Sequence, residues 1–79
     1  MSPKVFSAGP YRFYFFASDK TEPIHVHVRR DDFEAKFWLD PLEVAYNHGF
    51  SEHELNKIVK IVKHRRKEIK EKWNDFFTS

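Results

Sequence analysis

The strict alternation of apolar and polar residues from Ile24 to Arg29 is the feature that most constrains the fold of this chain. Successive side chains of a β-strand point to opposite faces of the sheet. The aliphatic residues of this run therefore share one face, and His25, His27 and Arg29 share the other. The aliphatic face predicts a core. Two imidazoles beside a guanidinium predict that any chemistry of the chain lies on the opposite face.

Length and composition limit what can be built around this strand. A chain of 79 residues predicts one domain with one core, to which nine Phe, three Tyr and two Trp supply large buried areas. Cysteine is absent, which excludes disulfides and thiolate chemistry and suits a reducing compartment. We find neither the apolar run of a signal peptide nor a stretch that approaches the ~20 apolar residues of a membrane span. The sequence therefore predicts a soluble, unprocessed cytoplasmic protein without a membrane association.

Further strands are expected on both sides of the alternating run. A short edge strand is predicted at 4–6, an aromatic strand at 11–17 and another alternating strand at 33–39. The residues 18–23 form a polar loop, and Asp31 and Asp32 form a tight turn. The segment 42–47 is open to two interpretations, a short strand or a connecting turn.

The tight turn sets a register between the two alternating strands, which pairs Arg29 with Glu34, Val28 with Ala35, His27 with Lys36, Val26 with Phe37 and His25 with Trp38. Both alternations then agree on the core face. We call the opposite side of the sheet the outer face; it holds Arg12, Tyr14, Phe16, His25, His27, Arg29, Glu34, Lys36 and Trp38. Aromatic and basic side chains are interleaved on it.

A helix is predicted to follow, from about residue 52 to about residue 76. Ser51 is the expected N-cap, Glu54 completes a capping box, and Gly49 lies in a turn that needs glycine. One helix arc carries an apolar stripe: Leu55, Ile58, Val59, Val62, Ile69, Trp73, Phe76 and Phe77. Arg66 falls inside this arc, where we expect it to reach past the sheet edge or to pair with an acid. The predicted fold is α+β, a single domain (1–79) with a small antiparallel sheet of three to four strands (about 4–45) packed on one long C-terminal helix.

The basic character of the chain is local. The net charge is only +2, yet residues 57–72 carry eight Lys/Arg against two Glu, whereas residues 1–50 carry six Lys/Arg against seven Asp/Glu. Such a helix flank either keeps a small protein soluble or attracts phosphates.

Four separated blocks of the sequence resemble a known family. They are Glu22–Val28, Ala35–Leu39, Asn47–Leu55, and Ile69 with Lys72–Phe77, in that order. Together they are similar to the bacterial family catalogued as domain of unknown function 4160. The resemblance implies a small cytoplasmic domain of strands followed by a long C-terminal helix. It also implies a gene beside that of another small domain, as in a toxin-antitoxin or similar two-gene module, and it brings no activity.

The two histidines have three interpretations, of which the first is a metal site. Imidazoles on alternate residues of a strand lie roughly 6 to 7 Å apart at the backbone, which suits two ligands of Zn²⁺ or Mn²⁺. A third ligand is needed, and the candidates are Glu34, Glu22, His48 and His53. The register brings only Glu34 near the strand. No cofactor is otherwise expected.

The second interpretation is a small ribonuclease-like enzyme centred on His25 and His27, with or without a metal. One histidine would take the 2′-hydroxyl proton and the other would protonate the leaving oxygen, while Arg29 or Lys36 stabilises the charge. In the third interpretation, both histidines pack against Tyr14, Phe16 and Trp38 on a face that a partner or a second subunit buries.

The sequence favours a binding component of a two-gene module. Its predicted binding surface comprises Arg12, Tyr14, His25, His27, Arg29, Lys36 and Trp38 on the outer face. The expected partner is the protein of a neighbouring gene or an RNA, whose single strands suit basic and aromatic surfaces better than duplex DNA does. A homodimer through the same face is a further expectation.

Overall fold

The computed structural model describes residues 4–78 and has the predicted α+β fold class. Five antiparallel strands form one sheet, and each strand pairs with its neighbours in the chain. The strands are β1 (Lys4–Ala8), β2 (Tyr11–Tyr14), β3 (His25–Arg30), β4 (Phe33–Leu39) and β5 (Leu42–His48). The prediction of three to four strands was one short, because the segment left open between a strand and a turn is β5.

The predicted register between β3 and β4 is confirmed at all five pairs, and a sixth pair joins Arg30 to Phe33. Phe13 of β2 lies opposite Val28. Asp31 adopts a left-handed conformation with φ of 55° at the tight turn. The alternation of apolar side chains and this turn therefore determine which residues face the core.

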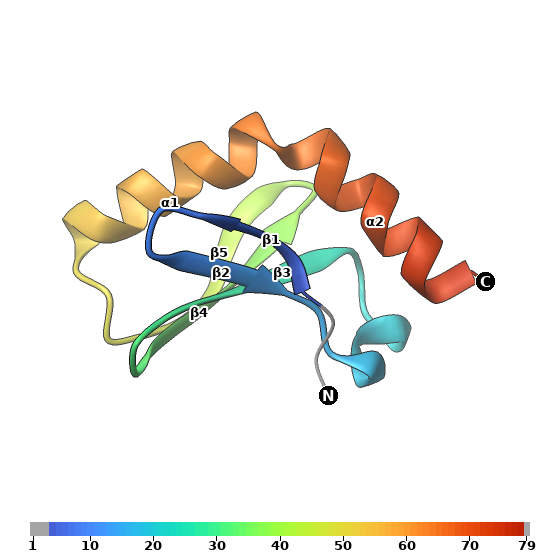
Figure 1. Ribbon diagram of the computed structural model, residues 1–79, viewed down its shortest axis with the longest axis horizontal. Helices are drawn as coiled ribbons and strands as arrows, with labels where there is room; N and C mark the ends of the chain where they lie inside the picture. Colours follow the sequence, from blue (N-terminus) through green and yellow to red (C-terminus); the bar gives the residue numbers. More distant parts are fainter. Residues whose placement is uncertain (1–3, 79) are drawn as a thin grey trace.

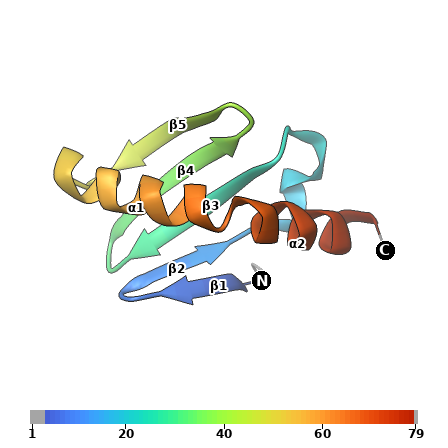
Figure 2. The same ribbon diagram turned by 90° about the horizontal axis from the view of Figure 1, so that it is seen from above.

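Two helices cross the core face of the sheet, as Figures 1 and 2 show. They are α1 (Glu52–His64) and α2 (Arg66–Thr78). The prediction of one continuous helix is wrong at Arg65, whose φ and ψ of −106° and 19° leave the helical range. The Arg65 guanidinium lies 3.7 Å from the ring centre of Phe6 and pairs with Glu68 at 2.8 Å. The interruption therefore places an arginine against β1 while the helices arch over the twisted sheet (Figure 1).

The core lies between the sheet and these helices. Four members of the predicted stripe are buried (Ile58, Val62, Ile69 and Trp73), and Leu55, Val59 and Phe77 pack partly buried against them. Phe76 was predicted to face the core, but 41% of its surface is exposed, since the break changes the direction of α2. Arg66 pairs with Asp40 at 3.4 Å, as one of its two interpretations predicted.

The turn before α1 is built as the sequence predicts. Gly49 has a φ of 110°, and a Cβ atom there would lie 2.4 Å from the Phe33 ring. Ser51 Oγ accepts the Glu54 N–H at 3.1 Å, which confirms the N-cap. The Glu54 carboxylate binds Arg30 and Tyr11 instead of turning back to Ser51, so only this half of the capping box forms. Across residues 4–78, no helix has the length and apolarity needed to cross a bilayer.

Candidate functional site

The β2–β3 connection covers one end of the outer face. Instead of an open loop, residues Ala17–Thr21 form the short 3₁₀-helix η1, which lies on the side of the sheet opposite to α1 and α2 (Figure 1). Asp19 is the buried residue of η1. Its Oδ2 atom accepts the Phe16 N–H at 2.7 Å, and this contact turns the carboxylate toward the sheet.

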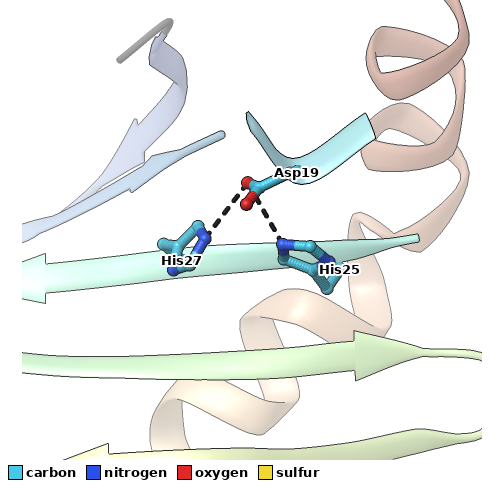
Figure 3. Close-up of side chains that lie close together, drawn as sticks. All are labelled: Asp19, His25 and His27. Atoms are coloured by element: carbon cyan, nitrogen blue, oxygen red, sulfur yellow. Dashed lines mark hydrogen bonds and ion pairs between the residues drawn. The ribbon is translucent and has the colours of Figure 1, made fainter. Parts of the chain in front are cut away.

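His25 and His27 of β3 lie beneath this carboxylate. The Nε2 atom of each ring is 3.1 Å from Asp19 Oδ2, and Figure 3 shows the two imidazoles on either side of it. His25 has 0% of its surface exposed and His27 has 4%. The prediction that these histidines are exposed on the outer face is therefore wrong, because η1 of the same chain covers them and Trp73 of α2 packs against the His25 ring at 5.1 Å.

The hydrogen bonds of His25 fix the position of its ring proton. Its Nδ1 atom lies 2.9 Å from the carbonyl oxygen of Pro23, which can only accept, so Nδ1 carries the hydrogen. In a neutral ring the Nε2 atom then has a lone pair. This buried atom finds no hydrogen-bond partner within residues 4–78, although it faces Asp19.

His27 lies among aromatic rings, as the packing interpretation expected, but the face is covered by η1 of the same chain, where that interpretation had a partner or a second subunit. It stacks on Tyr14 with ring centres 5.4 Å apart and meets the edge of Phe16 at 4.6 Å. Burial lowers the pKa of His27 below its ordinary value, although the Asp19 carboxylate acts in the opposite direction. The ring is therefore neutral at pH 7.

A second polar group extends the cluster toward β4 and β5. Tyr14 and Tyr46 donate to the same Glu34 oxygen at 3.0 and 3.3 Å, and the Tyr46 oxygen lies 3.5 Å from His27 Nδ1. Burial, reinforced by Glu34, raises the pKa of Tyr14 and of Tyr46 above their ordinary values. Both phenols keep their protons and act as donors.

The remaining predicted residues lie in two other places. Lys36 pairs with Glu22 at 2.5 Å and lies 4.4 Å from the ring centre of Trp38, whose edge meets His25. Two predicted arginines line a cavity of about 340 Å³ at the other end of the sheet. Its lining residues are Pro10, Arg12, Arg29, Arg30 and Asp31, and we call it the arginine cavity.

The predicted surface is thus divided. Tyr14, His25 and His27 come together in the interior, Lys36 and Trp38 lie beside them, and Arg12 and Arg29 are exposed elsewhere. The sequence interpretation missed Asp19 and Tyr46. None of the proposed third ligands faces both Nε2 atoms, and Asp19 takes that place. Tyr46 lies opposite Lys36 because the register between β4 and β5 shifts beside this pair, whereas simple alternation from Leu42 and Val44 would place it on the core face.

Asp19, His25 and His27 together offer the types of ligand atom that a metal ion binds. One carboxylate oxygen and two imidazole nitrogens, all within 4.8 Å of one another, could hold a divalent metal ion. A buried acid with two histidines is also a common hydrogen-bonding cluster.

Comparison with known proteins identifies the family. The model of the family described as a domain of unknown function (DUF4160) matches residues 11–74. The chain belongs to this family. No curated protein and no solved structure matches the chain significantly. The matched range contains Asp19, His25 and His27 and all lining residues of the arginine cavity except Pro10.

Proposed function

We propose that this DUF4160 protein is an RNA-binding module that holds phosphates in the arginine cavity. The observation that carries the proposal is the pairing of two exposed arginines: Arg12 of β2 lies directly opposite Arg29 of β3. Side chains in such a cross-strand pair are about 5 Å apart at Cβ, and like charges there are destabilising. An anion between them would remove that repulsion.

The acids near the cavity leave these two charges available. Arg29 Nε donates to the backbone carbonyl of Asp31 at 3.1 Å. The Asp31 carboxylate pairs with Arg30 at 2.9 Å, and Arg30 also binds Glu54. Arginine presents a planar set of donors that matches phosphate oxygens. A phosphate-bearing ligand is therefore the anion that this cavity suits best.

Contacts to phosphates alone would give RNA binding with little sequence preference. The aromatic rings that we expected to stack on bases are largely enclosed, since Tyr14 is buried and Trp38 is half-buried. Affinity would then come from charge and depend on salt. Large exposed apolar side chains in the described residues are Phe16, Val44 and Phe76, which lie on separate segments. A protein partner held by apolar contacts has less support.

The ribonuclease alternative has less support too. A general acid or base must come within hydrogen-bonding distance of the reacting group, and η1 encloses His25 and His27. We therefore assign binding and not catalysis to this domain. A cytoplasmic two-gene module of the toxin-antitoxin type, with a neighbouring protein as partner or a homodimer, remains part of this proposal.

The test is a salt series of RNA binding by fluorescence anisotropy. Arg12→Gln combined with Arg29→Gln should weaken binding and reduce the slope of log affinity against log salt by about 1 to 1.5, because each phosphate contact on a single strand contributes about 0.7. The matched control is Lys63→Gln with Lys67→Gln, which removes the same charge from exposed helix positions. Equal losses in the two variants, or no RNA binding by the parent, would refute the cavity as the site.

A further inference from the structure

The Asp19 carboxylate oxygen is spaced from each of the two imidazole nitrogens like neighbouring ligands of a metal ion, and the three donor atoms lie within 4.8 Å of one another, so the two rings need only a small inward shift to bind one ion. Bonds of about 2.0–2.1 Å at tetrahedral angles place neighbouring ligand atoms about 3.3 Å apart. Asp19 Oδ2 lies 3.1 Å from each Nε2 atom. The donors come from two segments, η1 and β3, which the rest of the fold brings together.

The orientation of His25 points to a missing cation. Its Nδ1–H donates to the Pro23 carbonyl. Metal-binding histidines are typically oriented in this way, by a hydrogen bond from the ring nitrogen that does not bind the metal. The Nε2 lone pair then faces a carboxylate oxygen in a water-poor interior, where two acceptors repel each other. Nε2 is the orphaned atom of this ring in the described chain. A cation between the two atoms turns this repulsion into two favourable contacts.

At His27, the ion would replace the hydrogen bond of 3.1 Å between Nε2 and Asp19 Oδ2, and the neighbouring groups can accommodate that change. If His27 binds through Nε2, its proton lies on Nδ1 and points to the Tyr46 oxygen 3.5 Å away. Tyr46 in turn donates to Glu34. His27 then donates to Tyr46 and Tyr46 donates to Glu34, so neither side chain is left with two acceptors facing each other.

We propose that Asp19, His25 and His27 bind a divalent transition-metal ion, for which Zn²⁺ is the probe. Two imidazoles and one carboxylate suit Zn²⁺, Mn²⁺ or Fe²⁺, whereas Mg²⁺ and Ca²⁺ prefer oxygen ligands. Three protein ligands leave a coordination position for water. The ion would also fasten η1 to β3 and so hold the β2–β3 connection on the outer face. This site lies at the end of the sheet away from the arginine cavity, so the inference does not depend on RNA binding.

The experiment is a Zn²⁺ titration of the full chain after treatment with a chelator. Calorimetry should give one tightly bound Zn²⁺ per chain, and Zn²⁺ but not Mg²⁺ should raise the melting temperature. Asp19→Asn keeps the size of the side chain and removes the anionic ligand. It should weaken Zn²⁺ binding at least about 100-fold, since even second-shell changes cost 10- to 100-fold.

Two matched controls separate this site from surface binding. Glu22→Gln removes an acid whose Oε1 atom lies 3.8 Å from His25 Nδ1, on the side of the ring away from the donor set. His53→Gln removes an exposed histidine of α1. Both variants should bind Zn²⁺ like the parent. A normal affinity in Asp19→Asn, or a loss in His53→Gln, would overturn the assignment.

A measurement on the parent protein does not require the variants to fold. Ring ¹⁵N chemical shifts should change on Zn²⁺ addition at the Nε2 atoms of His25 and His27, and not at those of the other three histidines. No Zn²⁺-dependent change at these two rings would refute the site.

Discussion

Arg30 and Glu54 form a two-point ion pair that joins the β3–β4 hairpin to the first turn of α1. Arg30 Nε lies 2.5 Å from Glu54 Oε2, and Arg30 Nη2 lies 2.8 Å from Oε1. Tyr11 donates to the same carboxylate at 2.8 Å. The ionised Glu54 carboxylate therefore links α1 to β2 and β3.

This carboxylate should make stability depend on pH. Its hydrogen bonds with Arg30 hold the pKa of Glu54 below the ordinary value of 4.5. A carboxyl group with a lowered pKa in the folded state stabilises the protein above its unfolded pKa, and this contribution is lost as the pH falls through the folded value. Glu54→Gln should therefore reduce the fall in stability below about pH 4.5. Urea midpoints across an acid pH series measure this, and Glu43→Gln, at an exposed position on β5, should leave the profile unchanged.

The N-cap of α1 gives a smaller and separate effect. Ser51→Ala should cost about 1 kcal/mol, because the Glu54 N–H loses its acceptor. A thermal melt or a urea midpoint measures the loss, and Ser18→Ala at an exposed position of η1 is the control. An unchanged midpoint in Ser51→Ala would show that the helix does not depend on this cap.

Trp73 tests the packing of α2 on the sheet. Its ring lies 5.2 Å from that of Phe15 and 4.4 Å from that of Phe77, and 7% of its surface is exposed. Trp73→Ala should destabilise the fold by about 3–5 kcal/mol through the cavity it leaves. Phe76→Ala should cost much less, because Phe76 is partly exposed. Chemical denaturation of both variants compares them, and similar losses would contradict the direction of α2.

The sheet was the most predictable part of the fold. Alternation of period two fixes which face each residue of a strand takes, and a tight turn fixes the register, so five pairs of β3 and β4 followed from the sequence. The interruption at Arg65 was not predictable in this way. Neither Gly nor Pro marks the position, and its side chain contacts Phe6, which is distant in the chain.

The site was predictable in its histidines and not in its acid. The alternation placed His25 and His27 together on one face. Asp19 lies in a polar segment that is typical of an exposed loop, and its burial depends on the local hydrogen bond from Phe16 N–H and on the hydrogen bond with His27 of β3. The same contacts explain why the histidines are enclosed, since the segment that supplies the acid is also their cover.

Replacement of both histidines by glutamine should destabilise the fold. In the interior each substitution loses ring packing; replacing His25 also removes the hydrogen bond to the Pro23 carbonyl, and replacing His27 removes the hydrogen bond with Asp19. Each should cost about 1–3 kcal/mol, and the double variant should be clearly less stable than the parent. Urea midpoints measured with a chelator present exclude any contribution from metal binding, and Arg29→Gln at the exposed end of β3 is the control. A double variant as stable as its parent would mean that η1 does not hold the two rings, and the outer face would again be a candidate contact surface.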